Sequence, residues 1–232
     1  MDIKEIFEGS NLPPQKPRQL DEVIVDWVKH SKGILNIAEH LEPNFKTTEH
    51  NKKILRLLLM YFVGTDAFVS ELETLSGTPG DLNKGIMLIG GVGTGKSLIF
   101  KIFNEYTKNV IGTNSFIPHT AIDIIDTVNV SGVGYLELFN HNMVDRIARP
   151  IRCYIDDIGS KNETVKHFGT DLSVIEQLLS IRYNIFERYG TLTHVSTNKF
   201  PSEMKDLYDI RIIDRMKTMF NIIELGGESF RK

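Results

Sequence analysis

An eight-residue run, Gly90-Gly91-Val92-Gly93-Thr94-Gly95-Lys96-Ser97, constrains the fold of this 232-residue chain more than any other feature. It matches the pattern G-x-x-x-x-G-K-[ST], follows the apolar stretch 86–89 and precedes an amphipathic stretch that starts at Leu98. Glycines let the backbone wrap closely, so that its N–H groups and the start of the following helix point at phosphate oxygens. The run therefore predicts a strand, a phosphate-binding loop and a helix, in that order.

We expect this loop to bind a nucleoside triphosphate together with Mg²⁺. The Lys96 ammonium would reach the β- and γ-phosphates, and the Ser97 hydroxyl would bind the metal ion. A guanine-specific site is disfavoured, because Asn198-Lys199-Phe200-Pro201 has proline where the guanine-reading N-K-x-D needs aspartate. ATP is therefore the expected nucleotide. The residues predicted to bind it are Gly90, Gly91, Val92, Gly93, Thr94, Gly95, Lys96, Ser97 and Leu98.

Two adjacent carboxylates, Asp156 and Asp157, follow the apolar residues of a predicted buried strand at 151–155. Such a pair is costly at a buried strand end unless a cation or hydrogen bonds compensate its charge. Beside a phosphate loop the compensating ion is magnesium. We expect Asp156 to hold the metal, through water, and Asp157 to orient or deprotonate the attacking water.

Three further polar residues are candidates for the same site. Asn198 follows a predicted strand at 192–196, where its amide would hydrogen-bond the γ-phosphate or the attacking water. Arg211 and Arg215 are four residues apart and share one helical face, from which an arginine could neutralise transition-state charge. Arg231, the penultimate residue, is a separate candidate for touching the γ-phosphate in cis.

The order of apolar patterns predicts an α/β fold with a mostly parallel sheet covered on both faces. Strands are expected at 85–89, 116–120, 151–155, 192–196 and 220–224, and helices at 96–108, 121–130, 171–189 and 201–217, the last broken near Asp209. The 30 residues between positions 120 and 151 leave room for an extra helix at 135–147.

Ahead of this unit, helical periods at 21–41, 49–63 and 66–75 predict a small all-helical N-terminal domain. We divide the chain into an extended arm at 1–20, a helical partner-binding domain at 21–80 and the phosphate-loop domain at 81–232.

Charge and cysteine content exclude several classes of protein. The chain has 27 basic and 30 acidic residues, a net charge of −3, which is too balanced for a nucleic-acid coat or a polybasic membrane anchor. Residues 1–80 hold 9 basic and 12 acidic residues and the remainder is neutral, which favours protein docking by the N-terminal part. A single cysteine excludes a disulfide framework and a multi-cysteine zinc site, and favours the reducing cytoplasm. No export or membrane-spanning segment is expected.

Taken in order, these motifs resemble the AAA+ ATPases, and specifically the DnaC/DnaI-type helicase loaders and the IstB-type transposition ATPases. The resemblance covers roughly residues 84–232. It implies that Arg215 is an arginine finger acting in trans, with Arg211 as its substitute, and that Arg231 is a second sensor. The chain stops there, which resembles loaders that lack a full helical lid. The usual second acid of the family is glutamate, so the shorter Asp157 implies slow turnover.

The resemblance implies an ATPase that forms homo-oligomers on ATP and loads or remodels a replicative DNA helicase, bound through residues 1–80. An IstB-like ATPase that serves a transposase, or a nucleotide-gated adaptor with incidental hydrolysis, are the alternatives. Single-stranded DNA is a further expected partner, contacted after ATP-driven assembly. Tyr135, Phe139, Arg146 and Arg149 could supply base stacking and phosphate contacts, although packing is the more common fate of such aromatics.

Overall fold

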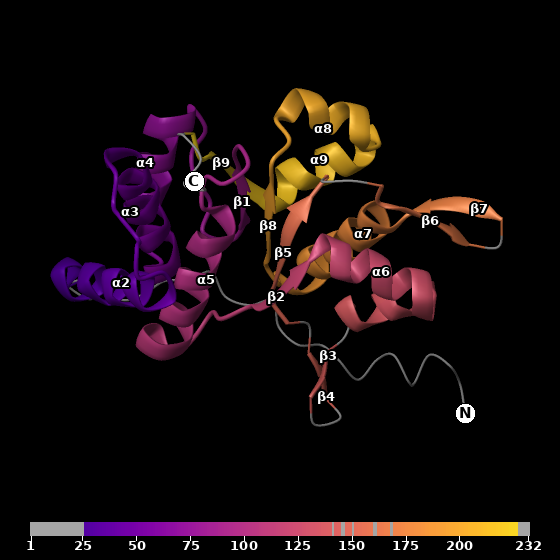
Figure 1. Ribbon diagram of the computed structural model, residues 1–232, viewed down its shortest axis with the longest axis horizontal. Coiled ribbons are helices and arrows are strands. Elements are labelled where there is room, and N and C mark those ends of the chain that lie inside the picture. Colours follow the sequence, from indigo (N-terminus) through magenta and orange to yellow (C-terminus); the bar gives the residue numbers. More distant parts are fainter. Residues whose placement is uncertain are drawn as a thin grey trace.

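A computed structural model describes residues 26–226, apart from positions 141, 145–146, 150, 160–161 and 168 (Figure 1). The predicted arm at 1–20 and the candidate sensor Arg231 lie outside the described residues. Within the described part, every helix is too short or too polar to cross a bilayer.

Five parallel strands form the central sheet in the order β2-β5-β8-β1-β9. Their bounds are β1 (Gly85–Ile89), β2 (Ile117–Thr120), β5 (Cys153–Ile158), β8 (Thr193–Thr197) and β9 (Phe220–Glu224). All five predicted strands are confirmed. The largest displacement is in β5, which starts two residues later than predicted and continues through the two aspartates.

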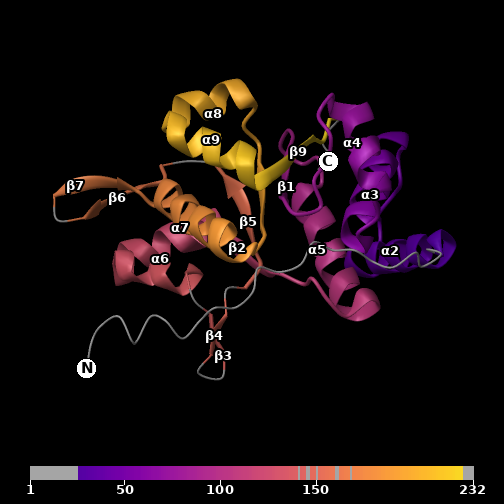
Figure 2. The same ribbon diagram turned by 180° about the vertical axis from the view of Figure 1, so that it is seen from behind.

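The sheet separates two hydrophobic clusters because successive side chains on a strand point to opposite faces. On β1, Ile86 and Leu88 join the cluster under α5 (Lys96–Tyr106), whereas Met87 and Ile89 join the cluster on the opposite face. Figures 1 and 2 show the two layers of helices on either side of the sheet.

The first layer also contains the N-terminal helices α2 (Trp27–Leu41), α3 (Glu49–Val63) and α4 (Ala67–Ser76). Helix α3 starts at a capping box, in which Thr48 and Asn51 each bind the other's backbone N–H. Its Leu57 and Leu58 are fully buried in the cluster shared with β1 and α5, and burial stabilises each by about 1.5–3 kcal/mol. The division of the chain at residue 80 remains a prediction.

The second layer holds α6 (Ala121–Ser131), α7 (Val174–Tyr189), α8 (Pro201–Leu207) and α9 (Ile210–Met219). The predicted break near Asp209 is confirmed. Asp209 caps α9, because its carboxylate accepts a hydrogen bond from the Arg211 N–H at 2.8 Å. On the first face, α5 continues into a π-helical turn, η1 (Thr107–Ile111).

The helix predicted at 135–147 is wrong. The segment forms a 3₁₀ helix, η2 (Val133–Phe139), followed by a hairpin of β3 (Asn142–Val144) and β4 (Ile147–Arg149). Leu136 and Phe139 are both buried, and their spacing of three residues fits the three residues per turn of a 3₁₀ helix. Phe139 is 6% exposed and packs on His119, so for this ring packing holds and the alternative of stacking on DNA bases does not. Arg146 lies outside the described residues.

The helix predicted at 171–189 begins three residues later, at Val174. The preceding residues pair as a second hairpin, β6 (Thr164–His167) with β7 (Thr170–Ser173), which projects from the body in Figure 1. Val165 and Leu172 face each other in this register and both pack against the second cluster. That burial, together with Gly169 in the turn at a φ of 83°, favours strand over helix.

Candidate nucleotide-binding site

The glycine-rich loop connects β1 to α5 at the carboxyl end of the sheet. The Gly90 N–H donates to the Thr197 carbonyl at 3.1 Å, which ties the start of the loop to β8. A Cβ on Gly90 would lie 2.4 Å from the Leu225 carbonyl oxygen, so only glycine fits between these backbones. Gly93 and Gly95 have φ angles of 82° and 90°, which other residues rarely adopt. The backbone geometry of the predicted loop thus requires glycine at these three positions.

Lys96 holds its ammonium over this loop. Its Nζ donates to the carbonyl oxygens of Gly90 and Gly91 at 2.7 and 2.9 Å, and the residue is 8% exposed. Thr94 closes the turn beneath it by donating to the Gly91 carbonyl at 2.9 Å. A buried ammonium bound to neutral carbonyls interacts more strongly with an anion, so phosphate oxygens are its expected partners.

The two remaining loop positions differ in exposure. Val92 is exposed at the crest of the loop, whereas Leu98 packs its side chain against the first-face cluster. Their contacts with nucleotide remain a prediction.

Three hydroxyl groups converge on one carboxylate oxygen of Asp156. Ser97 Oγ donates to Asp156 Oδ1 at 3.0 Å, which brings the phosphate loop and the acidic end of β5 together as predicted. The hydroxyls of Tyr154 and Ser196 also donate to Oδ1. Burial, and then the charge of Asp156, hold the pKa of Tyr154 far above its usual value, so this tyrosine stays a proton donor.

Asp157 lies in a β-bulge. Between Ile155 and Ile158 the pairing of β5 with β8 shifts, so that two residues of β5 face one residue of β8. Asp157 has a φ of 61°, and its N–H donates to Ser196 Oγ at 3.0 Å. The bulge interrupts the regular alternation of side chains at the two aspartates, and Asp156 contacts Ser97 of the loop.

Asn198 follows β8, the strand that separates β1 from β5. Its Oδ1 atom is buried and has no hydrogen-bond partner within the described part of the chain. A buried polar atom without a partner is costly, so a missing group is expected beside it. Asn198 thus follows a strand that neighbours the acidic strand β5, and its contact with a phosphate or a water remains a prediction.

The oxygen atoms at this site suit Mg²⁺. Asp156 supplies a carboxylate and Ser97 a hydroxyl, and Mg²⁺ typically takes one or two protein oxygens and completes its shell with phosphates and water. Among the described residues no group of three histidine, cysteine or acidic side chains could form a metal cage.

In the described structure, neither candidate arginine hydrogen-bonds to the loop, to Asp156 or to Asp157. The Arg211 side chain is 83% exposed and pairs with Asp209 at 3.0 Å. Arg215 instead donates to Ser180 Oγ at 2.8 Å, and its guanidinium lies over the Tyr183 ring at 5.1 Å. Both arginines are therefore placed on the outer helix α9, and their roles as fingers remain predictions.

Tyr154 and Ser196 are functional-site residues to which the sequence reasoning gave no role. Strand alternation contained the signal for Tyr154, because it is two residues before Asp156 and so shares its face. The contact of Ser196 with Asp156 depends on the register of β5 against β8, and this register cannot be derived from the sequence alone.

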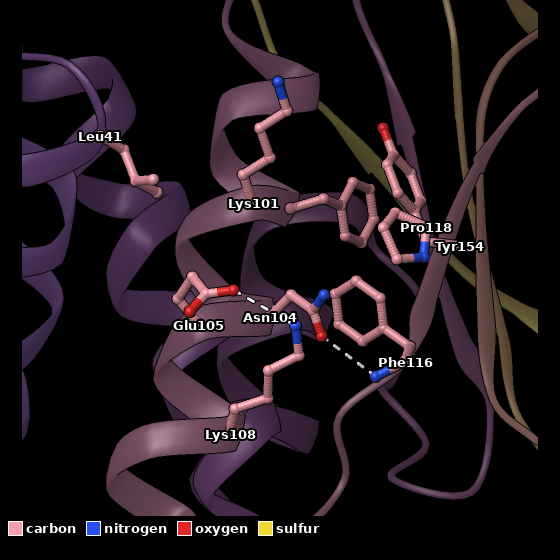
Figure 3. A pocket seen from close by; sticks show the side chains of 9 residues that line it. Leu41, Lys101, Asn104, Glu105, Lys108, Phe116, Pro118 and Tyr154 are labelled. Atoms are coloured by element: carbon pink, nitrogen blue, oxygen red, sulfur yellow. Dashed lines mark hydrogen bonds and ion pairs between the residues drawn. The ribbon is translucent and has the colours of Figure 1, made fainter.

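A pocket of about 250 Å³ lies further along α5, between that helix and the edge strand β2 (Figure 3). Figure 3 shows Lys101, Glu105 and Lys108 on its α5 side and the rings of Phe116 and Tyr154 on its sheet side. No residue of the loop or of the aspartate pair lines this pocket. The full lining is Leu41, Phe100, Lys101, Asn104, Glu105, Lys108, Phe116, Pro118 and Tyr154.

Several solved structures are similar in fold. A putative primosome component from Streptococcus pyogenes serotype M3 has a TM-score of 0.51 and 17% identity, over 80% of this chain and 84% of that chain. The DnaC helicase loader has a TM-score of 0.49 and 15% identity, over 80% and 95% of the two chains. AMPPCP-bound DnaA from Aquifex aeolicus has a TM-score of 0.45 and 18% identity over 79% of this chain, which spans about half (49%) of that DnaA chain.

No protein-family model and no curated protein matches the sequence. The likeness to the Streptococcus protein is one of fold. The chain thus has an α/β fold with a five-stranded parallel sheet, similar to that of the Streptococcus protein, with helices preceding the sheet, as its motifs predicted.

Proposed function

We propose that this chain binds and hydrolyses ATP with Mg²⁺, forms homo-oligomers on ATP, and loads or remodels a replicative DNA helicase. The observation that carries the ATPase part is the contact of Ser97 with Asp156 at 3.0 Å. A phosphate loop, a metal-binding carboxylate and an unsatisfied amide oxygen meet there at the ends of three adjacent strands. Helicase loading is supported by the order of the motifs, which is that of the loader family.

In this reaction Lys96 and the loop N–H groups hold the phosphates, and bound Mg²⁺ would supply positive charge against the charge that develops on them. Asp156 and Ser97 are the residues that would hold the metal. Asp157 accepts the proton of the attacking water, and Asn198 orients that water or the γ-phosphate. Arg215, or Arg211 in its place, comes from a neighbouring copy of the chain.

The first test is ATP binding by the variant Lys96→Ala. Loss of the only loop ammonium should abolish measurable binding of Mg-ATP in calorimetry. Lys101→Ala is the matched control, because Lys101 lies about one turn further along α5, is exposed and should retain full affinity. Unchanged affinity in Lys96→Ala would remove the basis of the proposal.

The second test separates binding from turnover. Arg215→Ala should bind ATP normally and lose hydrolysis, because its guanidinium is proposed to act on the site of a neighbouring copy. Lys217→Ala, an exposed cation on the same helix, is the control. Turnover per chain that does not change with protein concentration would contradict an arginine supplied in trans.

A nucleotide-gated adaptor is the second candidate, and the position of Arg215 favours it. This side chain is engaged with Ser180 and Tyr183 of its own chain, so hydrolysis would require its release. Capture from the native host with a non-hydrolysable ATP analogue tests the partner. Capture of a hexameric helicase supports loading, and capture of a transposase supports the IstB-like alternative. In a separate assay of ATP hydrolysis, negligible turnover that DNA does not stimulate supports the adaptor.

A further inference from the structure

Two carboxylates hold the turn between α8 and α9. The Tyr208 hydroxyl donates to Glu163 Oε2 at 2.7 Å, and the Asp209 N–H donates to Glu176 Oε1 at 2.7 Å. Tyr208 is 5% exposed, so its hydrogen bond is protected from water. This turn leads directly into the helix that carries both candidate arginines.

Glu163 also binds the backbone that follows the aspartate pair. Its Oε1 accepts a hydrogen bond from the N–H of Gly159, two residues beyond Asp157. Ile158, between them, is fixed to β8 because Thr197 Oγ1 donates to its carbonyl at 2.7 Å. One side chain thus joins the acidic end of β5 to the start of α9 through two hydrogen bonds.

The connection through Glu163 is made by a carboxylate and its hydrogen bonds, not by packing alone. Glu163 accepts its hydrogen bonds from a neutral hydroxyl and a backbone amide. Within the described part of the chain, Glu163 forms no ion pair with a basic side chain. Burial raises the pKa of its carboxyl above the ordinary value, although the hydrogen bonds from Tyr208 and Gly159 oppose that rise. An apolar side chain in this place would leave the Gly159 N–H and the Tyr208 hydroxyl without this acceptor, so the carboxylate is what connects the two elements.

We propose that Glu163 is a positioning residue, which couples the acidic end of β5 through Tyr208 to the helix that presents Arg211 and Arg215 to a second copy of this chain. The proposal rests on the proposed function, because it takes the nucleotide bound at the loop as the signal. A nucleotide that moves Asp157 shifts Gly159, and Glu163 carries that shift to the α8–α9 turn.

Hydrogen exchange of the full chain, with and without Mg²⁺ and a non-hydrolysable ATP analogue, tests the coupling. In the wild type the analogue should slow exchange both at the loop, residues 90–97, and at residues 208–216. Tyr208→Phe and Glu163→Gln should keep analogue affinity within about threefold and keep the slowing at the loop. Both variants should lose the slowing at 208–216.

Tyr189→Phe and Glu187→Gln are the matched controls, because they make the same chemical changes on the surface of α7. Both should behave as the wild type does. Slowing at 208–216 that persists in Tyr208→Phe and Glu163→Gln would overturn the coupling while leaving nucleotide binding intact. If calorimetry detects no analogue binding to the wild type, the proposed function fails first and the coupling fails with it. Equal loss of slowing at the loop and at α9 would assign Glu163 a merely structural role.

Discussion

Removing the Tyr154 hydroxyl tests the arrangement around Asp156 most directly. Tyr154 is 3% exposed, and its ring stacks on Phe100 with centroids 4.1 Å apart, so phenylalanine fits the same space. The hydroxyl lies within hydrogen-bond distance of Asp156 Oδ1 and, at 3.0 Å, of Ser196 Oγ. Tyr154→Phe therefore deletes one donor to a carboxylate and changes little else.

The magnitude follows from what remains after the substitution. A hydrogen bond to a charged group contributes about 1.5–3 kcal/mol to stability. Asp156 Oδ1 keeps the hydroxyls of Ser97 and Ser196, and Ser196 keeps the N–H of Asp157, so no buried group loses every partner. The loss should lie near the lower limit, about 1.5 kcal/mol, which for a chain of this length lowers Tm by about 3–6 °C.

Urea unfolding measures this loss as a lower midpoint with an unchanged m value. A double-mutant cycle with Asp156→Asn isolates the pair and should give a coupling energy of about 1–2 kcal/mol. Tyr61→Phe is the control, because the fully buried Tyr61 donates to the neutral Lys84 carbonyl at 2.7 Å and should cost about 1 kcal/mol. Additivity of Tyr154→Phe and Asp156→Asn within about 0.3 kcal/mol would refute a hydrogen bond to the carboxylate.

Two further predictions concern buried charges. In Glu163 burial holds the carboxyl pKa above its ordinary 4.5, so the folded state binds the extra proton and stability falls as pH rises from 4.5 through the folded pKa. The stability of Glu163→Gln relative to wild type should therefore increase over that window in urea unfolding at successive pH values, and a flat difference would contradict it. Arg182 is 1% exposed and donates to the Phe139 and Ile151 carbonyls at 2.9 and 3.0 Å. Arg182→Met should cost about 3 kcal/mol or more in the same assay, whereas the exposed Arg188→Met should cost under about 0.5 kcal/mol.

Strong local patterns in the sequence predicted the parts of the fold that they determine alone. The bounds of β1 and β9 match the prediction, because each is a short run rich in apolar residues. The break between α8 and α9 was also predictable from Asp209, which is a preferred capping residue. The loop followed from a motif whose glycines are required by backbone geometry at Gly90, Gly93 and Gly95.

Tertiary contacts decided the segments that were predicted incorrectly. Apolar residues at 135–139 fit an α-helix or a 3₁₀ helix equally well in sequence, and burial of Leu136 and Phe139 against the sheet selected the tighter one. The hairpin of β6 and β7 did have a local signal, since apolar and polar residues alternate on both sides of Gly169. The helical period after residue 174 was extended backward in the prediction to residue 171, so part of the hairpin was assigned to the helix.

The bulge at Asp157 gives a physical reason for the residue that departs from the family pattern. A non-glycine residue at a φ of 61° carries a backbone penalty, which aspartate and asparagine tolerate better than glutamate. The same bulge places the Asp157 N–H on Ser196, and Ser196 in turn on Asp156, so the backbone conformation and the metal-binding carboxylate depend on each other. A glutamate here would extend the acid by a methylene but would disfavour the conformation that organises Asp156. The short acid and the bulge are therefore one feature, in which a shorter reach for the proposed contact with water accompanies a fixed Asp156 carboxylate beside the loop.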